Sequence, residues 1–234
     1  MQIIITNDKH SKIVPKGLSR KWNIELQTAK DTLAATTQHV VHTAVHLVSR
    51  TLRVDHLHLH RPLLHGTWYA DTLLSKVKST RGITCANIFT QGRFTKVFPM
   101  TARSNAGQSL VDFTDDVGTP NRLVTNGAGE FTGKGKQFVK ELSHMRIQLH
   151  TNEQGWKNHN HVAKREIGFI LKRWKIRMQK KRVPKRLWDF GLVVESKILT
   201  QMGHGQDLRT GYEEITGQKF DISEWIEFEF YDLV

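Results

Sequence analysis

Short apolar segments separated by turn signals fill the middle of the chain, and this pattern predicts a β-sheet. Residues 67–77, 84–92 and 94–101 are rich in β-branched and aromatic residues, and the turn sequences STRG and QGR separate them. Residues 121–127 and 146–152 have the same character. The pattern therefore predicts five short strands, of which the first three follow one another directly.

Helical periodicity appears between and after these strands. Residues 104–118 repeat apolar positions at helical spacing, with Ser104 as the expected N-cap, and residues 135–145 form a second expected helix. A long helix is expected over residues 160–181, and another follows Pro184. This order predicts an α/β (α+β mixed) protein, in which a five-stranded mixed sheet is flanked by helices.

The two ends of the chain differ from this middle part. Residues 17–38 predict two short helices with a turn near Asn23, which fits either a small helix-turn-helix or two helices packed for stability. We therefore expect a helical N-terminal region with a histidine-rich linker over residues 1–65, a core over 66–200 and an acidic C-terminal extension over 201–234.

Composition excludes several classes of protein. The longest apolar runs are far too short to span a membrane, so no membrane association is expected. Cys85 is the only cysteine, which excludes an intrachain disulfide and fits an intracellular setting. Histidines at helical spacing (39, 42 and 46) and at alternating positions (56, 58 and 60) could bind zinc through imidazole, but with no cysteine nearby and no regular spacing, solvated side chains are the default interpretation.

The net charge of +13 is concentrated in one segment. Residues 157–186 are strongly basic and contain Glu166 as their one acid, whereas residues 221–234 contain acids and no base. A concentrated basic segment favours a polyanionic partner, most simply nucleic acid. The alternative on charge alone is a solvated helix face.

Five motifs together connect the chain to a known family: WYADTLLSKV, RGITCANIFTQGRFTKVFPM, LVTNGAGEFTG, NHVAKREIGFILKRW and VPKRLWDFGLVVESKIL. The set resembles the integrase region of copia-type retrotransposon polyproteins, particularly those of diatom-like protists. The resemblance implies a ribonuclease-H-like integrase core that joins DNA ends to target DNA with Mg²⁺ or Mn²⁺. It further implies DNA as the partner and a nuclear location, and it allows a homo-oligomer.

Three positions match the D-D-E triad of that family. Asp71 matches the first aspartate, Asn126 stands in place of the second, and Lys164 stands in place of the glutamate. An amide keeps one oxygen but loses its charge, and an ammonium is a donor only. Two divalent ions need several anionic oxygens, so Asp71 is expected to be the remnant of a metal site that binds no metal well.

Other acids are not expected to restore the site, because Glu130 accompanies the intact triad in the family and Glu166 faces away from Lys164 on a helix. Asp115 and Asp116 are expected to be solvated. A sharper hypothesis is that the Lys164 ammonium occupies the metal position and pairs with Asp71.

The resemblance also assigns the basic segment to DNA. The expected contacts are Asn160, Lys172, Arg173, Lys175, Arg177, Lys180, Lys181, Arg182, Lys185 and Arg186. Trp174 and Trp188 fall on apolar stripes and are expected in the core. The predicted function is a degenerate integrase core that keeps nucleic-acid binding and has lost catalysis; the alternative is a host-domesticated, non-enzymatic DNA-binding or interaction protein.

Overall fold

The computed structural model of the chain describes residues 13–38, 62–133, 136–151, 161–204, 208–223 and 230–231. The chain divides into two compact units. One consists of Met1–Arg53 together with Gln201–Val234, and the other is Val54–Thr200. The prediction from sequence treats the two ends as separate regions, whereas in the structure they belong to the same unit.

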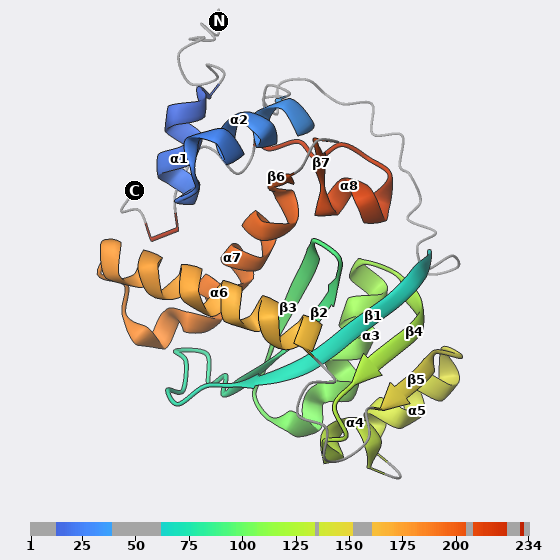
Figure 1. Ribbon diagram of the computed structural model, residues 1–234. Coiled ribbons are helices and arrows are strands. Elements are labelled where there is room, and N and C mark those ends of the chain that lie inside the picture. Colours follow the sequence, from blue (N-terminus) through green and yellow to red (C-terminus); the bar gives the residue numbers. More distant parts are fainter. Residues whose placement is uncertain are drawn as a thin grey trace, which may run out of the picture. The chain divides into compact units, whose positions relative to one another are not determined.

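The larger unit is built on a five-stranded sheet with the order β3-β2-β1-β4-β5 (Figure 1). The first three strands pair antiparallel, and β4 and β5 join the other side of β1 in parallel. The predicted mixed five-stranded sheet is thereby confirmed. The strands are β1 (Leu63–Leu74), β2 (Cys85–Gln91), β3 (Phe94–Met100), β4 (Thr119–Thr125) and β5 (Gln148–Thr151).

Helices cover both faces of this sheet (Figure 1). On one face, Phe113 of α3 (Ala106–Asp116) stacks on Phe89 at 4.4 Å between ring centroids and contacts the edge of Trp68 at 5.0 Å. On the other face, α6 (His161–Lys180) packs against β1 and β2. Because side chains alternate along a strand, Asp71 faces the side opposite to Trp68, which is the side of α6.

The end of the larger unit adds α7 (Trp188–Gln201) behind the short helix η4 (Lys185–Leu187). Gly191 allows α7 to approach α6 closely, since a Cβ there would lie 2.1 Å from the ring of Trp174. Trp174 and Trp188 are both buried, as predicted. Near the end of α7, the Thr200 hydroxyl accepts a hydrogen bond from the Thr95 N–H (3.0 Å) and donates to the Thr95 carbonyl (2.8 Å), which satisfies backbone groups of the edge strand β3.

Some element boundaries differ from the prediction. A turn of 3₁₀-helix, η3 (Arg103–Asn105), precedes α3, so Asn105 rather than Ser104 occupies the N-cap, and its side chain makes no capping bond. Strand β1 begins earlier than expected because parallel pairing with β4 extends back to Leu63. Two further helices, α4 (Gly129–Thr132) and α5 (Gln137–His144), follow β4, and the sequence predicted the second of them.

The smaller unit combines segments from both ends of the chain. Asn23 has the left-handed conformation (φ 51°) that ends the first helix, at the predicted turn. Thr32 is buried and accepts a hydrogen bond from the Gly203 N–H at 3.0 Å, whereas Leu26, at the start of the second helix, is exposed. Its elements are α1 (Pro15–Trp22), α2 (Leu26–Ala35), β6 (Gly203–His204), β7 (Arg209–Thr210) and α8 (Gly211–Thr216).

Two sequence hypotheses fall outside the described residues. The six histidines considered as zinc ligands lie between residues 39 and 60, and most acids of the C-terminal tail lie in 224–229 and 232–234. Within the described ranges, no helix combines the length and the apolar character that crossing a membrane requires.

Candidate active site and basic surface

Asp71 lies near the end of the central strand β1, on the face that α6 covers. Its side chain is buried, with 6% of its surface exposed. The Oδ1 atom accepts hydrogen bonds from the Thr72 backbone N–H at 2.9 Å and from the Asn126 amide at 2.7 Å. A carboxylate that is removed from water needs such donors, and here the protein itself supplies them.

Asn126 reaches Asp71 because of the parallel pairing of β1 and β4. Ala70 is the partner of Thr125 in this ladder. Asp71 and Asn126, which follow these two residues, therefore lie side by side at the same end of the two strands. The Asn126 oxygen accepts from the Ala128 N–H at 3.2 Å, which orients the amide so that its NH₂ group points toward Asp71. Asn126 therefore presents a hydrogen-bond donor to Asp71, and not a second carboxylate oxygen.

Lys164 lies in the first turn of α6 and is exposed. Among the described residues, no ion pair joins Lys164 to Asp71, although the Lys164 charge does favour the ionised form of Asp71. The Asn126 amide supplies the direct hydrogen-bond donor to the Asp71 carboxylate. Lys164 acts on Asp71 from a distance: burial raises the pKa of Asp71, while the Thr72 N–H and the Lys164 charge oppose that rise.

The residues at this site do not fit a pair of divalent ions. The part of the chain that the structure describes holds no group of three or more histidine, cysteine or acidic side chains arranged to bind a metal. Glu130, in α4, is near enough for its charge to raise the pKa of Asp71 further, but it is only a second carboxylate. Glu166 instead pairs with Arg165 at 3.2 Å. Asp115 and Asp116 are exposed, as expected, and Asp116 also forms an ion pair with Lys96.

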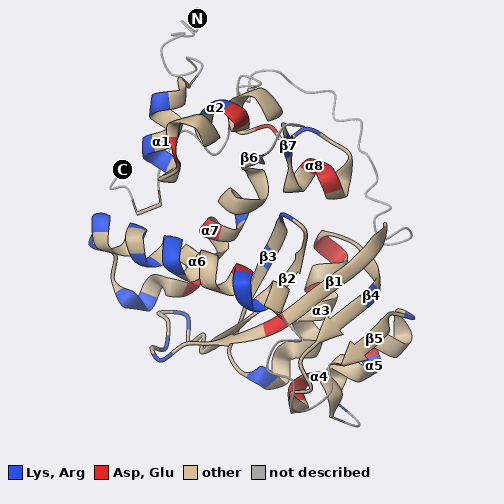
Figure 2. Cartoon of the chain, in the orientation of Figure 1, with Lys and Arg blue, Asp and Glu red and all other residues tan. Residues whose placement is uncertain are grey.

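The basic residues of this segment fall into two groups: those that are exposed to solvent, and those that bind a buried carboxylate. Figure 2 shows Lys and Arg distributed along α6 and the turn that follows it. Lys181 is half-buried, and Asn160 lies outside the described residues. The expected DNA contacts that are exposed are Lys172, Lys175, Lys180, Arg182, Lys185 and Arg186.

Arg173 and Arg177 belong to the second group, because their guanidinium groups point toward α7. Arg173 Nε donates to Glu195 Oε2 at 2.8 Å, and Arg177 Nε donates to Oε1 of the same carboxylate. Glu195 is 1% exposed, so this is a buried ion triad that holds α6 against α7. The sequence signal for it was a single acid within the apolar stretch LVVESKIL, which a count of charges does not detect.

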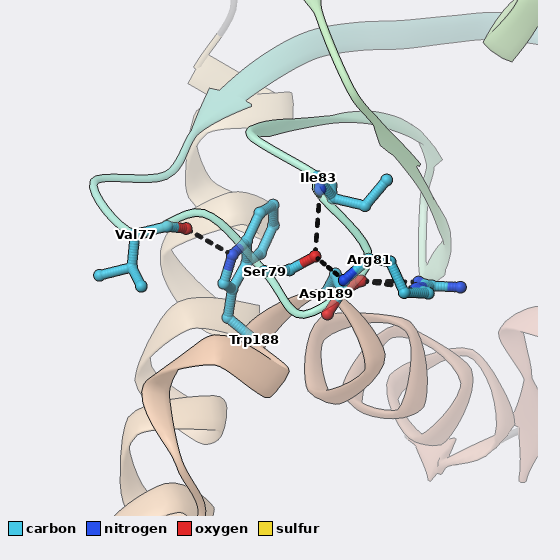
Figure 3. A network of polar contacts seen from close by, with 6 residues as sticks. All are labelled: Val77, Ser79, Arg81, Ile83, Trp188 and Asp189. Atoms are coloured by element: carbon cyan, nitrogen blue, oxygen red, sulfur yellow. Dashed lines mark hydrogen bonds and ion pairs between the residues drawn. The ribbon is translucent and has the colours of Figure 1, made fainter.

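A second polar network, which the sequence did not predict, ties the loop between β1 and β2 to the start of α7 (Figure 3). Trp188 Nε1 donates to the Val77 carbonyl at 2.8 Å. Arg81 binds the Asp189 carboxylate at 2.8 Å and also covers the Phe190 ring, with 3.9 Å between Cζ and the ring centroid. Asp189 is fully buried, whereas the Arg81 side chain remains 47% exposed.

Comparison with known proteins identifies the fold of this sheet. No family model and no curated protein matches the sequence. Among solved structures, the chain is similar to the simian T-cell lymphotropic virus intasome in complex with PP2A regulatory subunit B56 gamma, with 14% identity and a TM-score of 0.51 over 66% of this chain and 58% of that chain. It therefore spans less than two thirds of that chain.

Two integrase catalytic cores give similar matches. The catalytic core domain of BIV integrase shares 12% identity with a TM-score of 0.50, covering 64% of this chain and 93% of that one. The HTLV-2 integrase catalytic core domain in complex with magnesium shares 13% identity with a TM-score of 0.49, covering 67% and 99%. At these identities the likeness concerns the fold alone. The mixed sheet with its flanking helices is the ribonuclease-H-like fold of integrase cores.

Proposed function

We propose that this chain is an integrase core derived from a copia-type retrotransposon polyprotein of a diatom-like protist, and that it binds DNA without catalysing strand transfer. The likeness to integrase cores supports the fold part of this proposal. The observation that carries the functional part is the hydrogen bond from Asn126 to Asp71, at the place where an active integrase holds metal between two carboxylates.

The loss of catalysis follows from the charges at the site. Two-metal strand transfer requires anionic oxygens that bind both ions and hold them against water. Of the three positions that match the triad, only Asp71 holds an acid, and its Oδ1 already accepts hydrogen bonds from two N–H donors. Lys164 adds a positive charge at the third position, which repels a cation.

The retention of DNA binding rests on the exposed face of α6. Lys164, Lys172 and Lys175 are exposed and follow one another at separations that place them on one side of the helix. The buried residues Ala163, Ile170 and Trp174 occupy the opposite side. With a rise of about 1.5 Å per residue, the three lysines span roughly 16 Å, so they can contact several phosphates of one duplex.

We call this row, with Arg182 beyond the end of the helix, the α6 stripe. Its members are lysines and an arginine that would contact the phosphate backbone of DNA. The affinity should therefore depend strongly on salt concentration and little on the DNA sequence. A DNA partner also makes the nucleus the expected location in a eukaryotic cell.

Two experiments test the proposal. In a strand-transfer assay with Mg²⁺ or Mn²⁺, the unmodified chain should be inactive; product from the unmodified chain would overturn the loss of catalysis. Product from the Asn126→Asp/Lys164→Glu variant alone would confirm that these two positions carry the loss.

For DNA binding, fluorescence anisotropy with a labelled duplex should show tight binding at low salt. Lys172→Gln/Lys175→Gln/Arg182→Gln should weaken it strongly. The control is Lys136→Gln/Lys140→Gln, which removes two exposed lysines at and within α5, against three charges in the stripe variant, and should have a much smaller effect per charge removed. Absence of binding by the unmodified chain at low salt would refute retained DNA binding.

A further inference from the structure

The loop that connects β1 to β2, residues 75–84, has an ordered internal structure. The Ser75 N–H donates to the Thr84 carbonyl at 3.0 Å and closes the base of the loop. At its tip, the Ser79 hydroxyl accepts from the backbone N–H groups of Arg81 and Ile83, each at 3.1 Å. Gly82 completes the turn with a positive φ of 82°, a conformation that costs glycine little. The loop therefore presents its side chains in a defined arrangement.

Three interactions fix this loop beside η4 and the start of α7, and Figure 3 draws the first two. The Trp188 indole donates to the Val77 carbonyl, and Arg81 forms the ion pair with buried Asp189. In addition, the Thr80 N–H donates to the carbonyl of Arg186 at 3.0 Å. The last bond joins the loop directly to the basic segment, so two stretches that are about a hundred residues apart in sequence lie side by side.

The consequence is a concentration of positive charge. In the loop Lys76 and Lys78 are exposed, and in η4 Lys185 and Arg186 are exposed. Neither residues 75–84 nor residues 180–187 contain an acid. The one carboxylate that the network provides, on Asp189, is fully buried and already bound to Arg81. Cations held together in this way repel one another, and a polyanion bound across them relieves that repulsion.

We infer that the β1–β2 loop and η4 form one phosphate-binding surface that extends the α6 stripe and contacts the backbone of duplex DNA through Lys76 and Lys78. The inference rests on the proposed DNA binding and adds a segment that lies outside the basic region of the sequence. Because the added contacts are ammonium groups aimed at phosphates, they contribute affinity and salt dependence and no base preference.

The test measures the affinity of the full chain for a labelled duplex of arbitrary sequence by fluorescence anisotropy over a series of KCl concentrations. Each phosphate contact contributes about 0.9 to the slope of log affinity against log salt. Lys76→Gln/Lys78→Gln should therefore lower the slope by about 1 to 2. The control Lys136→Gln/Lys140→Gln makes the same change in net charge on a different element and should leave the slope nearly unchanged.

The outcomes separate this inference from the proposed function. If the unmodified chain binds and the α6 stripe variant weakens binding, but the loop variant behaves like the control, the loop surface is refuted while DNA binding stands. If the unmodified chain does not bind at low salt, both fail. A slope change in the loop variant that exceeds the control supports the loop surface.

Discussion

Replacing Asn126 with aspartate should turn the hydrogen bond inside the candidate site into a repulsion. In the structure the Asn126 amide nitrogen lies 2.7 Å from Asp71 Oδ1. A carboxylate oxygen in that place faces the Asp71 oxygen instead of donating to it. Two unit charges about 3 Å apart repel each other by roughly 5 kcal/mol at an effective dielectric of 20.

The pair can avoid part of this repulsion by binding one proton, and that sets the expected magnitude. Holding a carboxyl protonated at neutral pH, about three units above its ordinary pKa, costs roughly 4 kcal/mol. We therefore expect Asn126→Asp to lower the free energy of unfolding by about 4 kcal/mol at pH 7. The sign follows from the raised folded-state pKa of the pair: the loss is absent below the ordinary carboxyl pKa and grows as the pH rises from about 4 toward 7.

The assay is urea denaturation followed by tryptophan fluorescence, with EDTA present, at acidic and neutral pH. Asn126→Leu is the matched control, because it keeps the approximate shape and removes the donor without adding charge; its loss should stay at about 1–3 kcal/mol. If Asn126→Asp unfolds at the same urea concentration as the unmodified chain at pH 7, residues 71 and 126 are not in contact and the reasoning is refuted.

Metal should distinguish the same variants. A ligand at ten times its dissociation constant stabilises a protein by about 1.4 kcal/mol. We expect millimolar Mg²⁺ or Mn²⁺ to stabilise Asn126→Asp/Lys164→Glu by at least this order and to leave the melting temperature of the unmodified chain unchanged. Stabilisation of the unmodified chain by either ion, reversed by EDTA, would contradict the account of the site.

Further predictions concern single residues around the two surfaces. Arg81→Ala should lower the free energy of unfolding by about 3 kcal/mol in urea denaturation, because it leaves the Asp189 carboxylate buried without its partner; adding Asp189→Asn should recover part of the loss. Asp71→Asn keeps an acceptor for Asn126 and removes a buried charge. Burial raises the folded-state pKa of Asp71, so the ionised Asp71 lowers the stability of the folded chain. Asp71→Asn should therefore melt at a higher temperature than the unmodified chain at pH 7. The difference should vanish below the ordinary aspartate pKa, where Asp71 is neutral in both states. Equal melting temperatures at pH 7 would refute this. Lys164→Glu should lower the salt slope of DNA binding by about 1, whereas Lys140→Glu, the same charge reversal on α5, should change it little.

The order of strands and helices was predictable because each element of the core has its own hydrophobic pattern. In β1 the buried residues Trp68 and Ala70 alternate, and in α3 the buried residues Leu110 and Phe113 are one helical turn apart, so local sequence and tertiary packing agree. The first and last residues of each element were harder to predict from the sequence. Strand β1 starts at Leu63 because β4 pairs with it there, and a pairing partner some fifty residues away leaves no local signal.

The candidate site was predictable as a set of positions and not as a set of contacts. Matching the motifs placed Asp71 and Asn126 together, and the structure shows them hydrogen-bonded. The direction of the Asn126 amide depends on the Ala128 N–H, which only the folded turn supplies. Similarly, the sequence alone suggests that Arg173 and Arg177 are surface charges. In the structure both bind the carboxylate of Glu195, which α7 places between them.

Asn126 and Lys164, at which the family resemblance expects carboxylates, should affect different properties of the protein. Asn126 satisfies the Asp71 oxygen by a direct hydrogen bond inside the site, whereas Lys164 acts on Asp71 only through its charge, from a distance. Lys164 is exposed at the start of the α6 stripe, so its charge is available to a ligand in solution. Asn126→Asp should then reduce stability at pH 7 and leave the salt slope of DNA binding unchanged, while Lys164→Glu should reduce the slope and change stability little. Measuring both properties in both variants tests this separation. Equal effects of the two substitutions on both properties would show that Asp71, Asn126 and Lys164 act as one unit, as they would if the ammonium still balanced the buried carboxylate.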